Sequence, residues 1–182
     1  MNIFVLDRNP ANAVSYLADC HVRKMCLENA QILSTLVFMH NPRELPRIQL
    51  ELQGPGPYNT KHPVITAIDN ETKLKYVLRY NIELHKEYRF RFGKFHTYFK
   101  LHHYYLQALL RSATTPSSYS FECNPEGLYR CFGSFVSPEQ DLVYAYRDYY
   151  RYKKSVIRNW KYTKRQEPAW LQIGVTTDAR PT

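Results

Sequence analysis

The sequence predicts an all-α protein, a compact bundle of about four main helices with long irregular loops. Two observations support this fold class. Apolar residues recur at helical spacing along extended segments, and capping residues stand at the points where those segments begin. The helices are expected at residues 11–39, 66–92, 95–112 and 137–160, after a short apolar run at 3–6 that is extended.

Each expected helix has a recognisable boundary. Asn9-Pro10 starts the first, because Asn can cap a helix and Pro at the first helical position has no amide to leave unpaired. This helix is expected to end before Asn41-Pro42. Gly93 ends the second, since glycine readily adopts the left-handed conformation found after helices. Ser137-Pro138-Glu139-Gln140 has the pattern of a capping box and is expected to open the fourth.

The connections between the helices are long. Residues 40–65 are rich in proline and include Gly54-Pro55-Gly56-Pro57, which predicts a long irregular loop. Loops of this length are usually functional or disordered. Residues 113–136 form a second connection rich in Ser, Thr, Pro and Gly. Few helix signals follow Pro168. We therefore expect one domain over residues 1–170 and a flexible tail over 171–182.

The charge of the chain indicates its class of partner. The 182 residues carry a net charge of +9 and include sixteen tyrosines and nine phenylalanines. A positive surplus of this size favours nucleic acid, a membrane surface or an anionic protein as partner. No apolar stretch is long enough to span a membrane and no signal peptide is recognisable. The four cysteines, at 20, 26, 123 and 131, show no Cys-x-x-Cys pair, so neither a disulfide framework nor a zinc site is expected in this intracellular, reduced protein.

A polar strip runs along the first predicted helix, directly beside its apolar stripe. It consists of His21, Lys24, Glu28 and Gln31, at spacings of three, four and three residues. One interpretation is a solvated helix face with a Lys–Glu ion pair. The other is a catalytic carboxylate at the edge of the core, positioned for general acid or base chemistry.

The same helix carries a resemblance to a known family. Leu17-Ala18-Asp19-Cys20-His21-Val22, followed by Glu28 seven residues after the histidine, resembles the helix signature of the phage pyrimidine-dimer DNA glycosylases, the T4 endonuclease V family. The segment from Pro63-Val64-Ile65 to Ile82-Glu83-Leu84 and Gly93 is also similar to that family. Trp160-Lys161-Tyr162 and Pro168-Ala169-Trp170 are similar in aromatic and basic character.

The resemblance implies a T4 endonuclease V-like fold and a DNA glycosylase that flips a nucleotide out of the duplex. In that family the N-terminal amine attacks the sugar C1′, and the resulting Schiff base leads to strand cleavage by β-elimination, an AP-lyase activity. Glu28 takes the place of the catalytic carboxylate. The apolar run from Ile3 to Leu6 is expected to hold the chain start near Glu28. The implied partner is double-stranded DNA, with no cofactor, no metal, no membrane and no obligate protein partner, and the implied location is cytoplasmic, in the host if a phage encodes the protein.

The nucleophile is left open by the sequence. The family exposes a small residue after Met1 is removed, whereas the bulk of Asn2 should hinder removal here. The amine therefore belongs to Met1, or to Asn2 if Met1 is removed, or the lyase chemistry is absent. Lys24 is the alternative nucleophile if burial desolvates its ammonium. His21 either orients a phosphate or Glu28, or is a histidine at the edge of the core. A protein that keeps the fold and binds nucleic acid without catalysis is the alternative function.

Residues 143–165 concentrate the positive charge. This segment contains eight Lys and Arg but one acidic residue, Asp148, which gives it a net charge of +7. Six tyrosines and Trp160 are interleaved with the charged residues. Clustered cations neutralise phosphates and aromatic faces stack on unpaired bases. A helix that packs its tyrosines into the core and extends its cations outward would show the same pattern, and both readings can hold together. The candidate DNA-contacting residues are Arg23, Gln31, Lys61, His62, Arg91, Lys94, Arg151, Lys154, Arg158, Trp160, Lys161, Lys164 and Arg165.

Overall fold

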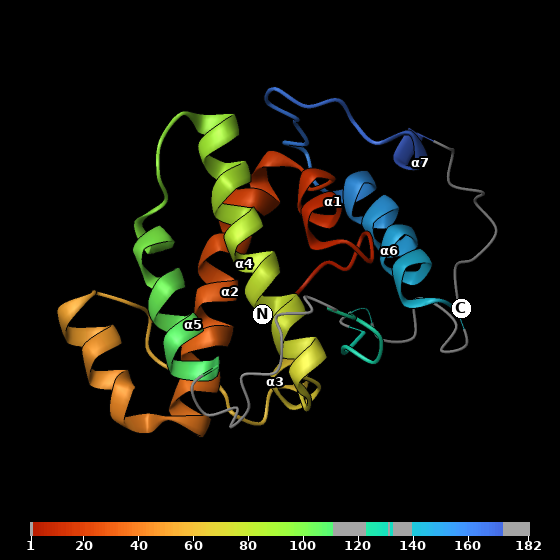
Figure 1. Ribbon diagram of the computed structural model, residues 1–182. Coiled ribbons are helices and arrows are strands. Elements are labelled where there is room, and N and C mark those ends of the chain that lie inside the picture. Colours follow the sequence, from red (N-terminus) through yellow and green to blue (C-terminus); the bar gives the residue numbers. More distant parts are fainter. Residues whose placement is uncertain (1, 111–122, 131, 133–139, 173–182) are drawn as a thin grey trace.

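The computed structural model describes residues 2–110, 123–130, 132 and 140–172, and within these ranges the chain forms helices and no strand (Figure 1). The two long helices, α2 (Asp19–His40) and α4 (Glu71–Phe92), pack against each other. α1 (Pro10–Ser15) crosses α4, and α5 (His102–Leu110) lies against both long helices. α6 (Leu142–Val156) lies on the other side of α1 (Figure 1). The predicted all-α class is confirmed.

The first predicted helix is two helices. Asn9 caps α1 as expected, because its side-chain oxygen accepts the amide hydrogen of Ala11 at 3.0 Å. The prediction of one continuous helix over 11–39 is wrong, since the chain leaves the helical conformation between Ser15 and Asp19. Tertiary partners cause the break: Ala18 is extended, and its amide donates to the Tyr150 hydroxyl at 2.8 Å. Propensity alone does not predict a break that depends on residues far away in the sequence.

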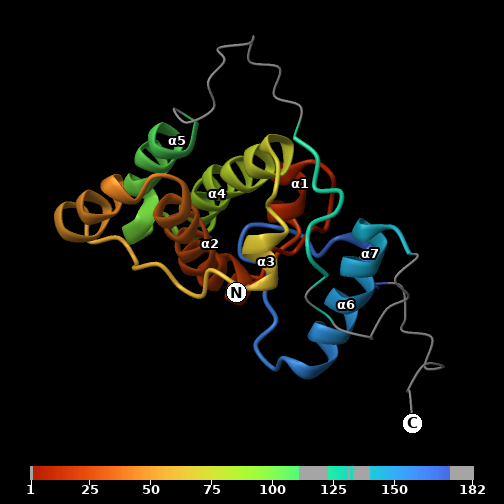
Figure 2. The same cartoon turned by 90° about the horizontal axis from the view of Figure 1, so that it is seen from below.

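The proline-rich region contains more structure than expected. Residues 40–65 hold a 3-10 turn, η1 (Pro42–Glu44), a π-helical turn, η2 (Arg47–Glu51), and the start of the one-turn helix α3 (Pro63–Thr66). In the view of Figure 2, α3 lies between α2 and α6. α4 begins at Glu71 instead of 66 because the Asn70 side chain caps it, accepting the Lys73 amide hydrogen at 3.0 Å. It ends at Gly93, as predicted, where φ is +69°.

The last two predicted helices are shorter than expected. The segment from 95 begins with the 3-10 turn η3 (Thr97–Leu101), which leads into α5, while residues 111–112 lie outside the described ranges. α6 starts at Leu142, because Asp141 accepts the amide hydrogens of Val143 and Tyr144. The proposed cap at Ser137–Glu139 lies outside the described residues. α6 ends at Val156 instead of 160, and a one-turn helix, α7 (Ala169–Gln172), follows where few helix signals were found.

The core is one hydrophobic cluster that reaches from the start of the chain to α7. Much of the tyrosine content belongs to it, because the following five are almost fully buried: Tyr76, Tyr80, Tyr105, Tyr146 and Tyr150. Leu171 is also buried, so the segment assigned to a tail begins with a residue that packs on the core. Residues 173–182 lie outside the described ranges.

A buried arginine connects three parts of this core. Arg91, near the end of α4, donates to the carbonyl oxygens of Ser15 at 2.9 Å and Leu17 at 2.7 Å. It also donates to Asp19 at 3.0 Å and Glu87 at 2.7 Å. Its side chain has no exposed surface. The assignment of Arg91 as a DNA contact is therefore wrong: its guanidinium closes the corner between α1 and α2.

The C-terminal segment is tied to the same network. The Thr163 hydroxyl donates to Asp19 at 2.7 Å, and Arg165 donates twice to Glu87, at 2.9 and 2.8 Å. Burial raises the pKa of Asp19, but the hydrogen bonds from Thr163 and Arg91 outweigh it and the net shift is downward. Both carboxylates are thus held in their charged form by named donors.

Replacing Arg91 by Met tests this network. The Arg91→Met variant keeps most of the side-chain volume but leaves Asp19 and Glu87 without their shared cation, so the free energy of unfolding should fall by about 3–5 kcal/mol. Urea unfolding followed by circular dichroism measures this loss. The control is Lys86→Met, which removes an exposed cation of α4 and should change stability by less than about 1 kcal/mol. Equal losses in the two variants would contradict the assignment.

Candidate active site

The start of the chain is held against the middle of α2. Ile3, Phe4, Val5 and Leu6 are at most 5% exposed, which fixes the path of this segment. The backbone nitrogen of Asn2 donates to Glu28 Oε2 at 3.1 Å, and the Glu28 side chain is 15% exposed. The Asn2 side-chain oxygen lies 3.2 Å from the Tyr146 hydroxyl and 2.7 Å from the Ile3 nitrogen. The expectation that the apolar run holds the chain start near Glu28 is confirmed.

A cavity of about 360 Å³ opens beside this contact. Its wall combines a carboxylate, a neutral imidazole, two amines and several apolar or aromatic surfaces. The lining residues are Asn2, Phe4, Cys20, His21, Lys24, Met25, Glu28, Tyr149, Lys153 and Ile157. Pockets that bind small organic groups have this mixture of apolar walls and few polar groups.

His21 is a buried, neutral member of that wall. Its Nδ1 lies 2.8 Å from the Tyr150 hydroxyl, and its ring packs against Phe4 and Trp160 at centroid distances of 4.8 and 5.3 Å. Burial, reinforced by the charges of Lys24 and Lys153, lowers the pKa of His21 to about 4. We assign the Tyr150 hydroxyl proton to His21 Nδ1, because among the described residues the hydroxyl has only the Ala18 amide, which is a donor, as its other partner. The hydrogen of the neutral imidazole then resides on Nε2.

The polar strip divides into buried and exposed members. Glu28 and His21 are mostly covered, whereas the Lys24 side chain is 67% exposed and its Nζ lies 3.3 Å from Glu28 Oε1. The expected Lys–Glu ion pair is therefore present, but it joins a solvated ammonium to a shielded carboxylate. Gln31 lies half-buried one turn beyond Glu28.

The candidate DNA contacts fall into two groups. Some cations are exposed and, within the described part of the chain, form no ion pair: Lys61, Lys94, Arg158 and Lys161. Arg23 is also exposed and stacks over the Phe92 ring at 4.5 Å. His62 caps α3, and its pKa is lowered by burial and by the positive charge of the chain start, which the negative charge of Glu28 opposes in part.

The second group holds loops in place. Arg151 donates to the Trp170 carbonyl oxygen and pairs with Asp148, and Lys154 pairs with Glu167 at 2.8 Å. Lys164 donates to the Phe90 carbonyl oxygen at 3.0 Å, and Arg165 pairs with Glu87. Trp160 packs its ring on His21 and on Tyr150, at 4.9 Å from the latter. The predicted single basic helix is thus divided: α6 ends at Val156, and the later cations lie on a segment that returns to α2.

Sequence reasoning missed several residues of the cavity wall. Phe4, Tyr149 and Lys153 line it, and Tyr150 fixes His21 from behind. The signal was available in part, because positions 146, 149, 150, 153 and 157 share one face of a helix. What the sequence did not contain was the information that this face covers the start of the chain.

The protonation of His21 can be measured directly. The ring resonances of His21, assigned by comparison with the His21→Gln variant, should titrate with a midpoint at about pH 4 and stay constant between pH 6 and 8. Because the folded pKa lies below the unfolded value, protonation favours unfolding, and the stabilising contribution is lost as pH falls from about 6.5 through 4. A midpoint near 6.5 would show that His21 is solvated and would remove it from the cavity wall.

A protein family matches the first half of the chain. The pyrimidine dimer DNA glycosylase family matches residues 1–101, which include the chain start, Glu28 and all of α4. Neither the curated proteins nor the solved structures give a significant match. Among the described helices, none has the length and apolar character needed to cross a membrane. The all-α architecture is consistent with an endonuclease V-like fold, and the matched family covers more than half of the 182 residues, so the chain belongs to the pyrimidine dimer DNA glycosylase family.

Proposed function

We propose that this protein is a DNA glycosylase that excises a damaged or modified base from double-stranded DNA, with the α-amino group as nucleophile and Glu28 as its partner carboxylate. The observation that carries the proposal is the 3.1 Å contact between the Asn2 nitrogen and Glu28 Oε2 at the edge of the cavity. Family membership supports glycosylase chemistry. A single domain, residues 1–170, carries the activity, in keeping with its one continuous core.

The chemistry requires an unprotonated amine beside a carboxylate. The amine lone pair attacks C1′ of a flipped nucleotide, the glycosidic bond breaks, and the base leaves with the electron pair and takes up a proton. Glu28 stabilises the positive charge that develops on the nitrogen and accepts its proton. Ring opening gives a Schiff base. Loss of the C2′ proton and departure of the 3′ phosphate then cleave the strand, which is the proposed AP-lyase step.

The α-amine is favoured over Lys24 as the nucleophile. An α-amino group has a reference pKa near 8, against about 10.4 for a lysine side chain, so it is the more readily deprotonated class of amine. The burial that would desolvate Lys24 is absent, since its side chain is 67% exposed. If Met1 is removed, the nitrogen that contacts Glu28 is itself the amine; if Met1 stays, the amine lies one residue earlier. The intact mass of the purified protein distinguishes the two cases.

His21 and Lys153 contribute binding and orientation in this proposal. Both line the cavity, and neither forms a hydrogen bond with Glu28 in the described part of the chain. The neutral His21 supplies a hydrogen-bond donor to the flipped nucleotide, and Lys153 supplies a positive charge for its phosphate. Cations outside the cavity, including Lys61, Arg158 and Lys161, extend the surface available to the duplex.

Borohydride trapping on DNA that carries an abasic site tests the catalytic assignment. Wild type should form a covalent adduct, because borohydride reduces the Schiff base to a stable amine. Glu28→Gln should lower the trapping rate by about 10²–10⁴-fold while DNA affinity stays within a few-fold of wild type. Acetylation restricted to the α-amine should abolish the adduct.

Lys24→Ala is the matched control for the nucleophile. This variant should still form the adduct, because Lys24 pairs with Glu28 Oε1, whereas the Asn2 nitrogen contacts Oε2. If Lys24→Ala loses the adduct and the wild-type protein with an acetylated α-amine still forms it, Lys24 is the nucleophile. Wild type could instead bind DNA in a salt-sensitive manner, form no adduct and release no base. This outcome would contradict the enzyme and support a non-catalytic DNA-binding protein.

The DNA-binding surface has its own test. Lys161→Ala and Arg158→Ala should each weaken duplex binding to a similar degree for all sequences and reduce the slope of log affinity against log salt by about 1, as expected for one lost phosphate contact. Fluorescence anisotropy over a salt series measures both quantities. Arg43→Ala is the control, because Arg43 lies beyond the C-terminal end of α2, and that end, at His40, is about 18 Å along the helix from Glu28. If only Arg43→Ala changed the slope of log affinity against log salt, the duplex would bind on a face of the protein other than the one that carries Arg158 and Lys161.

A further inference from the structure

Three side chains with strong metal-binding chemistry meet on the side of α2 away from Glu28. Cys26 of α2, His85 of α4 and His96, in the turn after α4, bring one ligand atom each to within 4.8 Å of one another. Cys26 and His85 are buried and His96 is half-buried. Positions 26 and 28 of a helix point about 160° apart, so this cluster is separate from the carboxylate at the chain start.

The burial of the His85 imidazole in this cluster has no other explanation in the fold. It is 1% exposed, and neither of its ring nitrogens has a hydrogen-bond partner among the described residues. A neutral imidazole carries one donor and one acceptor, so complete burial without partners is costly. Its neighbours are rings: His96 at a centroid distance of 5.8 Å and Phe99, edge on, also at 5.8 Å. A ligand-binding role accounts for a buried polar side chain that the fold leaves unpaired.

We propose that Cys26, His85 and His96 bind one zinc-type divalent cation that ties α2 to α4. A thiolate and two imidazoles are ligands that zinc prefers, and three protein ligands leave one coordination position open. Two imidazoles on one tetrahedral zinc ion have their centroids about 5 Å apart, close to the distance between these rings. Tetrahedral zinc holds its ligand atoms about 3.3–3.8 Å apart, so binding requires the three atoms to draw together by roughly 1 Å, which side-chain rotation supplies.

Binding removes a proton from one ligand and replaces a hydrogen bond of another. The Cys26 thiol, whose pKa burial raises to about 12, loses its proton to solvent as the sulfur–metal bond forms. His85 is ready as it stands, because burial keeps its imidazole neutral. His96 accepts the Tyr98 amide hydrogen on Nδ1 at 3.3 Å, and ligation through either of its nitrogens replaces this long hydrogen bond.

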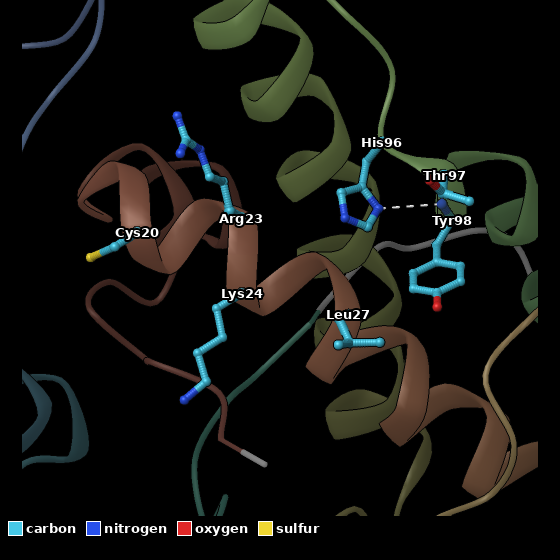
Figure 3. A pocket seen from close by; sticks show the side chains of 7 residues that line it. All are labelled: Cys20, Arg23, Lys24, Leu27, His96, Thr97 and Tyr98. Atoms are coloured by element: carbon cyan, nitrogen blue, oxygen red, sulfur yellow. Dashed lines mark hydrogen bonds between the residues drawn. The ribbon is translucent and has the colours of Figure 1, made fainter.

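The site has a path to solvent. His96 forms part of the wall of a pocket of about 530 Å³, opposite Cys20, Arg23 and Lys24 of α2 (Figure 3). An ion can enter from this pocket, and a water molecule can hold the open position. Arg23 and Lys24 are exposed, so solvent and salt screen their repulsion of the cation. Cysteine spacing does not reveal such a site, because its ligands come from three separate elements.

Cobalt substitution tests the proposal on the full-length, tag-free protein after EDTA treatment. One equivalent of Co²⁺ should produce the intense visible bands of a tetrahedral site and a thiolate-to-cobalt charge-transfer band in the near ultraviolet. One equivalent of Zn²⁺ should abolish these bands and raise the thermal unfolding midpoint of the metal-free protein. The charge-transfer band should be lost in Cys26→Ser, and His96→Gln should weaken Co²⁺ binding at least ~10-fold.

Cys20→Ser is the matched control, because Cys20 lines the same pocket but is not part of the cluster; this variant should keep the band and the affinity. Weak octahedral absorption in wild type, or a band that survives in Cys26→Ser, would overturn the proposal. If circular dichroism shows that Cys26→Ser does not fold, the His96→Gln variant is the test. An unchanged Co²⁺ affinity in His96→Gln would then overturn the proposal. Borohydride trapping by the metal-free protein is independent of this outcome, so failure here is distinguishable from failure of the glycosylase proposal.

Discussion

The structure depends on one buried guanidinium. Arg91 satisfies the carbonyl oxygens of Ser15 and Leu17, which a continuous helix would have paired with its own amides, and it neutralises Asp19 and Glu87. This bonding permits the chain to turn between α1 and α2. The turn sets the direction of α2 and therefore the side from which Glu28 faces the chain start. Asp19, which stands within the motif that carries the family resemblance, thus has a structural role, because its partners are Arg91 and Thr163.

A second constraint comes from Tyr150 and the aromatic side chains around it. Its hydroxyl accepts from Ala18 and binds His21, so one side chain of α6 fixes both the break before α2 and the orientation of the imidazole. Phe4 packs edge-on to Tyr150 with centroids 5.2 Å apart, and this contact carries the start of the chain into the same cluster. The cavity is therefore assembled from three distant parts of the sequence, and packing between these parts brings its polar groups together.

The positive charge of the protein serves two purposes. Arg91, Arg151 and Arg165 hold segments together through carboxylates and carbonyl groups. In contrast, Arg158 and Lys161 remain exposed and form no ion pair within the described part of the chain. Part of the net charge of +9 therefore comes from cations that already bind groups of the protein itself. Arginine is suited to the internal role, because its planar group donates to several acceptors at once and stays charged when buried.

The sequence by itself determined the helical class, the cap at Asn9, the end of α4 at Gly93 and the polar strip that contains His21 and Glu28, because these follow from local preferences and helical periodicity. Tertiary structure alone decided that residues 11–39 form two helices, that Arg91 is buried, that Tyr149 and Lys153 line the cavity, and that Cys26 meets His85 and His96. The physical reason is the same in each case. A hydrogen bond, ion pair or contact between residues far apart in the chain has no periodic signature, and its free energy exceeds the small local propensities that a sequence pattern expresses.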